Sequence, residues 1–237
     1  MRVAIVIPAL DEAGSIGRVL DDIPASLAAE VLVVDGGSKD TTREISAAKG
    51  ARVILEARRG YGRACLTGIE RTNGADVVVF LDGDYSDRPA ELPRLLAPIR
   101  DGAADIVLGS RLRGGLAAGA MPWHQLLGNR LAAGLIRVLY GVRLTDLGPF
   151  RAVRRDVLEA LALREQTYGW AVELPTRGAR SGWRVVEVPV SYHPRIGVSK
   201  ISGTLRGTLG AAWCILTGIV VNRLRPEARV GGAARPA

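Results

Sequence analysis

The first half of the chain alternates short apolar runs with segments in which apolar residues recur every three or four positions. Short apolar runs are typical of buried strands, and the second spacing is typical of helices with one buried face. The pattern predicts strands over 3–7, 31–34, 52–55, 77–81 and 105–108, and helices over 16–23, between Asp40 and Gly50, over 61–71 and over 90–99. Such repeated units predict an α/β fold with a mostly parallel central sheet and helices on both faces.

The second half of the chain is less regular. Its pattern predicts helices over 123–140, 156–163 and 171–181, a strand over 184–190, and an irregular or extended segment over 147–153. No internal repeat and no long linker divides the sequence. Residues 1–204 are therefore expected to form a single domain.

An apolar stretch over 207–221 lies close to the C-terminus, with arginines on both sides. It is shorter than the roughly 20 residues that a spanning helix needs. We expect a C-terminal helix over 205–225, which either packs on the core or lies in the membrane interface. Residues 226–237 are expected to be a disordered tail.

The net charge of +8 comes almost entirely from arginine, because only three of the 32 basic residues are lysines. A basic chain suits anionic lipid, nucleic acid or phosphate-bearing substrates, although genomic codon bias explains the arginines equally well. Aromatic residues make up only 5% and no compact basic run occurs, so nucleic acid is not an expected partner.

The two cysteines and two histidines show no zinc-ligand spacing. The N-terminal apolar run is too short for a signal peptide. We therefore expect a cytoplasmic protein, peripheral on the cytoplasmic face of the membrane and attracted to its anionic surface.

Three polar clusters follow predicted parallel strands directly. They are Pro8-Ala9-Leu10-Asp11-Glu12, Asp35-Gly36-Gly37-Ser38 and Asp82-Gly83-Asp84. Ligands of open α/β sheets bind outside the carboxyl ends of the strands. Three acidic clusters at that edge would repel one another without a cation or a ligand rich in donors, so together they indicate a functional site.

Asp82-Gly83-Asp84 carries the most specific chemistry. In extended backbone the residues i and i+2 face the same side, so the two carboxylates aim at one point. Carboxylate oxygens beside phosphate oxygens suit Mg²⁺ or Mn²⁺. A solvated Asp-Gly turn is the alternative. Asp87 either joins the metal ligands or caps the following helix.

With these clusters in order, the chain resembles the family 2 glycosyltransferases of the GT-A (Rossmann-like) fold, and within them the polyprenyl-phosphate (dolichol-phosphate) hexose synthases. The resemblance covers about residues 3–203. Besides the three clusters, it rests on Gly109-Ser110-Arg111, Asp146-Leu147-Gly148-Pro149-Phe150-Arg151 and Ser199-Lys200.

The resemblance implies transfer of a hexose, with inversion, from a nucleotide diphosphate sugar (UDP-glucose or GDP-mannose) to a polyprenyl phosphate. The residues expected to bind the nucleotide sugar are Pro8, Leu10, Glu12, Asp35, Asp82 and Gly83, with Asp82 and Asp84 holding the metal. Those expected to meet donor or acceptor phosphates are Arg111, Arg151, Arg195 and Lys200. We expect Asp84, Arg111 and Arg151 to be catalytic.

The sequence departs from the family pattern at two places. Gly36 replaces an acidic residue, and Gln125 and Leu126 stand where a basic residue is often found. Binding of the acceptor phosphate is then expected to involve Arg113 or Arg130. Gly60-Tyr61-Gly62-Arg63 matches the family's glycine turn after the third strand, which makes Arg63 a further phosphate candidate.

Other functions stay open at this point. A glycosyltransferase with a soluble acceptor would need a carboxylate base, for which Glu173 is the candidate. A sugar-phosphate nucleotidyltransferase would need a glycine-rich loop after the first strand, and 8–12 is not one. A non-catalytic nucleotide- or nucleic-acid-binding protein is the alternative of another class.

Overall fold

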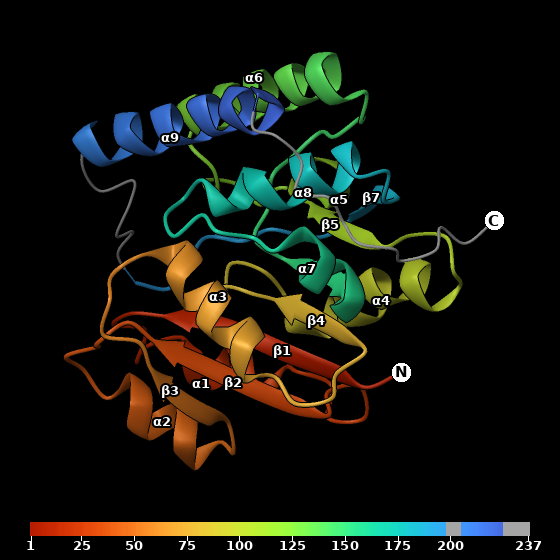
Figure 1. Cartoon of the computed structure of the whole chain (residues 1–237). Helices are drawn as coiled ribbons and strands as arrows, with labels where there is room; N and C mark the ends of the chain where they lie inside the picture. Colours follow the sequence, from red (N-terminus) through yellow and green to blue (C-terminus); the bar gives the residue numbers. More distant parts are fainter. Residues whose placement is uncertain (198–204, 225–237) are drawn as a thin grey trace.

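A central sheet organises the part of the chain that the computed structural model describes, which is residues 1–197 and 205–224. Within these ranges it has seven strands in the order β3-β2-β1-β4-β6-β5-β7 (Figure 1). The strands are β1 (Val3–Ala9), β2 (Glu30–Asp35), β3 (Arg52–Leu55), β4 (Val77–Phe80), β5 (Ile106–Ser110), β6 (Arg151–Arg154) and β7 (Val185–Pro189). The predicted α/β fold is confirmed.

Strand β6 is the single antiparallel member of this sheet. It lies between β4 and β5 and runs against both, whereas the other pairs are parallel. Its first residue, Arg151, pairs with Phe80 and Leu108. The reversed direction therefore brings the start of β6 to the edge where the parallel strands end. The sequence pattern predicts an irregular or extended segment over 147–153, and only the last three of these residues belong to the strand.

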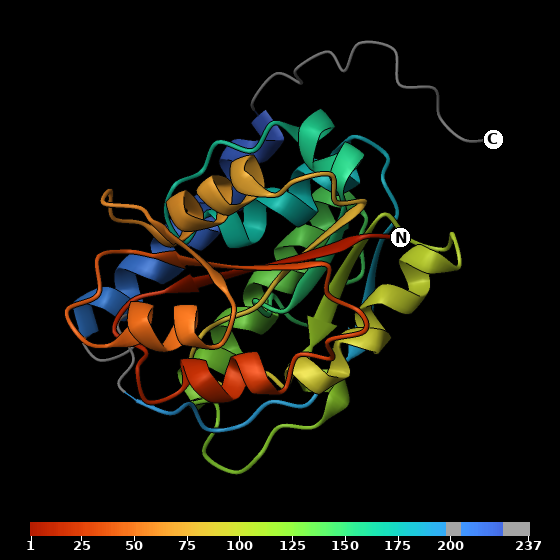
Figure 2. The same cartoon turned by 90° about the horizontal axis from the view of Figure 1, so that it is seen from below.

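Helices cover both faces of the sheet, as predicted (Figure 2). They are α1 (Ile16–Asp21), α2 (Thr42–Ala48), α3 (Tyr61–Arg71), the 3₁₀ helix η1 (Pro89–Glu91), α4 (Leu92–Arg100), α5 (Arg111–Gly114), α6 (Trp123–Tyr140), α7 (Arg155–Leu161), α8 (Trp170–Arg180) and α9 (Leu205–Leu224). Helices α1 and α4 bury apolar residues against one face. Helices α3 and α6 to α9 do so against the other.

Strands β1 and β4 are apolar throughout because both of their faces are buried. In β1 the side chains of Ile5 and Ile7 enter one core, while that of Val6 enters the other. This two-sided burial produces the continuous apolar runs of the sequence. The predicted bounds 61–71 and 123–140 agree with α3 and α6.

Helix α9 lies beside α6 in the outermost layer, at the top of Figure 1. Ile219 is buried, and its carbonyl oxygen accepts a hydrogen bond of 2.5 Å from the Tyr140 hydroxyl. Asn222 donates to Thr176 of α8 at 3.2 Å. One face of the predicted C-terminal helix therefore packs on the core. Within the described ranges, every helix is too short or too polar to cross a membrane. The predicted tail over 226–237 lies outside these ranges.

Candidate active site

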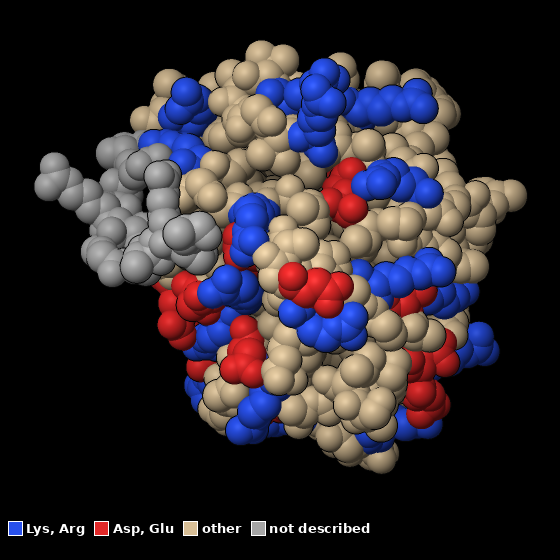
Figure 3. All heavy atoms as spheres, turned by 90° about the vertical axis from the view of Figure 1, so that its right-hand side faces the viewer, with Lys and Arg blue, Asp and Glu red and all other residues tan. Residues whose placement is uncertain are grey.

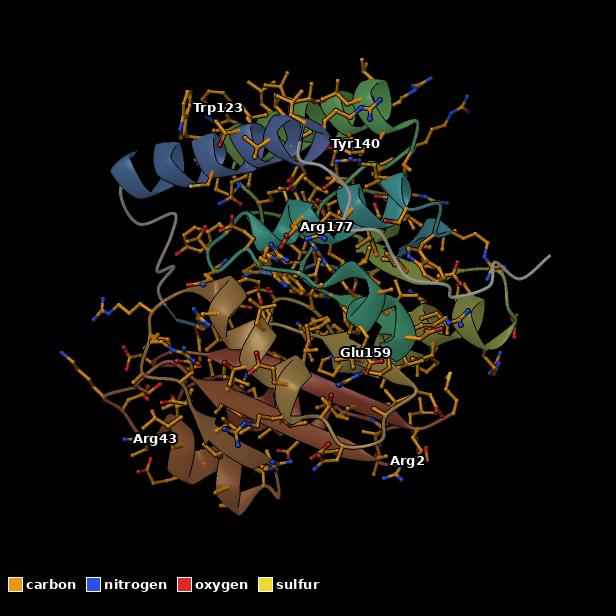
Figure 4. The ribbon with its side chains drawn as sticks, in the orientation of Figure 1. Arg2, Arg43, Trp123, Tyr140, Glu159 and Arg177 are labelled. Atoms are coloured by element: carbon orange, nitrogen blue, oxygen red, sulfur yellow. The ribbon has the colours of Figure 1, made fainter. Side chains whose placement is uncertain are left out.

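The three polar clusters lie together at the edge formed by the carboxyl ends of β1, β2 and β4. In Figure 4 this edge lies on the left, where Arg43 is labelled beyond the end of β2. Arg2, beside the start of β1, is labelled on the opposite side. Pro8, Leu10 and Glu12 are all partly exposed there. The predicted juxtaposition of the loops after these strands is confirmed.

Hydrogen bonds tie the loop after β1 to the loop after β2. The amide of Asp11 donates to the Ser38 hydroxyl and the amide of Glu12 to the Thr42 hydroxyl, both at 2.8 Å. The Asp35 carboxylate accepts hydrogen bonds from the amides of Gly37 and Ser38 at 3.0 and 2.9 Å. Asp35 is fully buried. It therefore shapes its own loop from inside, and its predicted contact with the nucleoside stays a prediction.

Asp82 stands at the end of β4, with Tyr61 beside it. The Tyr61 hydroxyl donates to Oδ1 of Asp82 at 3.1 Å. Although Asp82 keeps some exposed surface, burial of its carboxyl and repulsion from Asp84 raise the pKa of Asp82 to about 7. A cation placed between the two carboxylates would remove this repulsion and favour the charged form of Asp82.

Asp84 is buried and is held from two sides. Its Oδ1 accepts hydrogen bonds from the Ser86 amide and hydroxyl at 2.9 and 2.6 Å. Its Oδ2 lies 3.2 Å from Nη1 of Arg195. The amide of Ile196 also donates to the Asp84 carbonyl oxygen at 2.9 Å. The segment 193–196 therefore lies against the Asp82–Asp84 loop and brings the predicted Arg195 to it.

Gly83, between the two carboxylates, has an ordinary environment. A methyl group added there would lie 3.5 Å from Cγ of Glu12 and 3.6 Å from Cδ1 of Ile16. These are ordinary contacts, so close backbone approach does not require glycine at this position. They do show that the loop carrying Asp82 and Asp84 packs beside the loop carrying Glu12.

Asp87 has both carboxyl oxygens buried, without a hydrogen-bond partner among the described residues. It does not cap the following helix, since η1 begins after Arg88 and has no side-chain cap. Burial, together with the charge of Asp82, raises the pKa of Asp87 well above the usual carboxyl value. A third carboxyl group, whose protonated form burial favours, therefore lies within electrostatic reach of Asp82.

Arg111 forms a buried, two-pronged ion pair with Asp146. Its Nε lies 2.6 Å from Oδ2 and its Nη2 lies 2.7 Å from Oδ1 of Asp146. Burial opposes the charges, but these hydrogen bonds raise the pKa of Arg111 and keep the pKa of Asp146 below its usual value. The Arg111 guanidinium also lies over the Tyr192 ring. Much of its hydrogen-bonding capacity is thus used within the protein, and its contact with phosphate stays a prediction.

Arg151 is fully buried and is surrounded by backbone carbonyls. Its guanidinium donates to the carbonyl oxygens of Gly148, Ala171 and Leu147 at 2.7, 2.7 and 3.1 Å. It also lies 5.5 Å from the centre of the Trp170 ring. These hydrogen bonds fix the segment between Asp146 and β6 against α8. A contact of Arg151 with phosphate stays a prediction.

The remaining basic residues occupy different parts of the molecule. Arg63 lies on the first turn of α3, and its Nε is buried without a partner among the described residues. Arg113 is exposed and donates to the Glu187 carbonyl oxygen at 2.9 Å. Arg130 is exposed on α6, in the outer layer. Lys200 lies outside the described residues.

Glu173, the carboxylate considered as a base, is buried and engaged. It accepts hydrogen bonds from the amides of Arg164 and Glu165 at 3.0 and 2.8 Å. Arg177 lies 3.2 Å from it on the same helix. Glu173 therefore holds the loop that precedes α8.

Sequence analysis missed Tyr61 as a member of the site. It is flanked by Gly60 and Gly62, where there is no room for a side chain. A methyl group at Gly60 would lie 2.2 Å from the carbonyl oxygen of Gln166, and one at Gly62 would lie 2.3 Å from that of Glu165. This close packing seats the start of α3 against the segment 165–167 and directs Tyr61 toward Asp82. The two glycines around a tyrosine were the available signal.

Comparison with known proteins agrees with this geometry. The model of the family "Glycosyl transferase family 2" matches residues 4–162. An uncharacterised glycosyltransferase of Mycobacterium tuberculosis is 38% identical over 208 residues, covering 87% of this chain and 93% of that protein. The undecaprenyl-phosphate mannosyltransferase of Micrococcus luteus is 35% identical over 226 residues, covering 87% and 90%.

A solved structure has the same fold. The glucosyl-3-phosphoglycerate synthase of Mycobacterium tuberculosis, in complex with Mn²⁺ and UDP-glucose, aligns with a TM-score of 0.74 at 25% identity, covering 96% of this chain and 80% of that one. The family model spans the three polar clusters. The chain therefore belongs to glycosyl transferase family 2 and is a glycosyltransferase of the GT-A fold.

Proposed function

We propose that this glycosyltransferase moves a hexose from a nucleotide diphosphate sugar to a polyprenyl phosphate, with Mg²⁺ or Mn²⁺ held by Asp82 and Asp84. The observation that carries the proposal is the position of these carboxylates at the carboxyl edge of the sheet, with Arg195 3.2 Å from Asp84. Relatives named undecaprenyl-phosphate mannosyltransferase and polyprenol monophosphomannose synthase support the acceptor class.

The oxygen atoms available as metal ligands fit a hard divalent cation. Asp82 and Asp84 supply carboxylate oxygens, and the described residues hold no group of three or more acidic, histidine or cysteine side chains that would surround a metal alone. Magnesium is commonly bound by one or two carboxylates together with substrate phosphates. When bound, the metal would neutralise the charge that develops on the leaving nucleotide diphosphate.

A phosphate acceptor suits the site better than a hydroxyl acceptor. A hydroxyl needs a base, and the side chain considered for that role, Glu173, is bonded to backbone amides. A phosphate monoester, with a second pKa of about 6, is largely dianionic at neutral pH. Its oxygen can attack the anomeric carbon directly while the bond to the diphosphate breaks, which inverts the configuration. In this proposal Arg195 faces the reacting phosphates, and Arg111 and Arg151 position the segments around them.

The test is transfer by the purified full chain. GDP-mannose and UDP-glucose are each incubated with Mn²⁺ and a short polyprenyl phosphate, and the products are identified by mass spectrometry. We expect a polyprenyl phosphohexose from at least one donor and none in EDTA. Asp84→Asn should lower the rate roughly tenfold to a thousandfold, whereas the exposed control Asp101→Asn should not.

A soluble phosphorylated acceptor is the competing outcome, since the aligned solved structure is named a glucosyl-3-phosphoglycerate synthase. Parallel reactions with 3-phosphoglycerate and with unphosphorylated polyprenol separate the two. Transfer to 3-phosphoglycerate alone would replace the lipid acceptor by a soluble one. Transfer to the unphosphorylated alcohol would remove the argument that no base is needed. A peripheral position at the cytoplasmic face of the membrane would follow from the lipid acceptor.

A further inference from the structure

The large exposed apolar side chains are concentrated on two neighbouring helices. Ten such residues occur among the described residues, and eight of them lie on α6 and α9. They are Trp123, Leu127, Leu131 and Val138 on α6, and Trp213, Val220, Val221 and Leu224 on α9. Contiguous apolar surface of this kind marks a site of interaction with a protein or a membrane.

The spacing of these residues makes a stripe along each helix. Trp123, Leu127 and Leu131 follow one another at intervals of four, which places them on one side of α6. Trp213, Val220 and Leu224, at intervals of seven and four, do the same on α9. The opposite sides of the helices, with Ile136 and Ile219, are buried in the core. The stripes therefore belong to the outer side of this two-helix layer, and we call them together the α6–α9 face.

The charged side chains on these two helices are all basic. Neither α6 nor α9 contains an aspartate or a glutamate, although the chain has 24. Arg130, Arg137 and Arg223 are exposed on them. In Figure 3 basic side chains reach the top of the view, where these helices lie, while the acidic ones lie lower. The α6–α9 face is thus apolar, flanked by arginine and free of acidic residues.

We propose that the α6–α9 face docks on an anionic lipid bilayer, with both helices lying along its surface. Tryptophan and leucine on one side with arginine beside them are the features of helices that bind in the interface. Each arginine near an anionic surface adds about 1 kcal/mol of attraction. A second copy of the chain is a poorer occupant, since a two-fold contact would bring the arginines of both copies together with no acidic residue on either face.

A short stretch of chain joins the catalytic edge to the α6–α9 face. Only nine residues separate Arg195, at Asp84, from the start of α9. The purpose of docking rests on the proposed function, because a polyprenyl phosphate resides in the membrane. The face itself is independent of it.

The experiment compares sedimentation of the full chain with vesicles of phosphatidylcholine alone and with vesicles of equal parts phosphatidylcholine and phosphatidylglycerol. We expect binding to the anionic vesicles. The double variant Leu127→Glu/Leu131→Glu should bind at least about tenfold more weakly. Leu55→Glu is the matched control, because Leu55 is 58% exposed, close to the 56% of Leu131, but lies on β3 at the other end of the sheet.

The outcomes are distinct. Absence of binding to anionic vesicles, or equal loss in the Leu55→Glu control, would overturn the proposal. A dimer in sedimentation equilibrium that the double variant dissociates would assign the face to a second copy instead. Transfer to a short polyprenyl phosphate without vesicles is measured in parallel. Vesicle binding without transfer would leave docking intact and reject the proposed function, and transfer without vesicle binding would do the reverse.

Discussion

The guanidinium of Arg195 and the carboxylate of Asp84 are 3.2 Å apart, so an arginine side chain contacts an oxygen that we assign to a metal. Two cations beside one carboxylate repel each other. We therefore expect Arg195 to compete with the metal for Asp84 unless a diphosphate draws the arginine away.

Replacement of Arg195 by methionine should change metal binding in two opposite directions. Without nucleotide, Mn²⁺ should bind about threefold to tenfold more tightly, because a nearby positive charge is lost. With UDP or GDP present, that gain should disappear, since a phosphate contact is lost as well. Titration of free Mn²⁺ by electron paramagnetic resonance measures both. Arg100→Met, at an exposed pair, is the control, and unchanged Mn²⁺ affinity in Arg195→Met would contradict the competition.

The buried pair of Arg111 and Asp146 should be important for stability. Asp146→Asn leaves a buried guanidinium without its counter-charge, and we expect a loss of about 3–5 kcal/mol in the free energy of unfolding. Asp21→Asn, which breaks the exposed pair with Lys49, should cost below about 1 kcal/mol. Urea denaturation measures both. The double variant Arg111→Met/Asp146→Leu should lose less than Asp146→Asn, and an equal or larger loss would argue against burial of charge as the cause.

Asp87 should make stability depend on pH. Because its pKa is raised in the folded chain, its contribution is fully present below the unfolded pKa of about 4 and is lost as the pH rises through the folded pKa. Asp87→Asn has no such proton to lose. Its melting temperature should match that of the unmodified protein near pH 4 and exceed it at pH 8, by roughly 2–4 °C per kcal/mol. The same difference at both pH values would show that Asp87 does not titrate in this way.

Arg151→Lys should lower the free energy of unfolding more than it changes the binding of the acceptor. Lysine keeps the charge but cannot reach three carbonyl oxygens in the plane of a guanidinium. We expect a loss of about 1–3 kcal/mol, from carbonyls left without a donor. Denaturation and the KM for a short polyprenyl phosphate are measured together. A raised KM at unchanged stability would instead favour the direct phosphate contact that the sequence suggested.

The sequence predicted the strands well because β1, β2, β4 and β5 are buried on both faces, which leaves continuous apolar runs. It did not predict that residues 151–154 form strand β6, or that this strand runs antiparallel to its neighbours. Four residues are too few for a period, and the antiparallel direction depends on where the chain returns to the sheet.

The site was predictable at the level of loops and less so at the level of side chains. Asp82 and Asp84 follow a strand, and their shared edge comes from topology. The orientations of Arg151 and Glu173 depend on backbone groups up to 20 residues away, which no local pattern encodes. Asp35 instead accepts hydrogen bonds from amides two and three residues along its own loop. In each case a charged side chain serves backbone groups, which the sequence pattern did not show.

The reversed strand also has a consequence for the order in which the protein can be made. Among the described residues, strand β5 pairs only with β6 and β7, so residues 106–110 leave the ribosome before either partner strand exists. The first partner begins at Arg151. Throughout that interval the nascent chain carries an apolar strand with both edges open, which is the kind of segment that associates wrongly with other chains. The half of the sheet from β3 to β4 is complete by then, and the second half must be added to it after residue 154 has been synthesised.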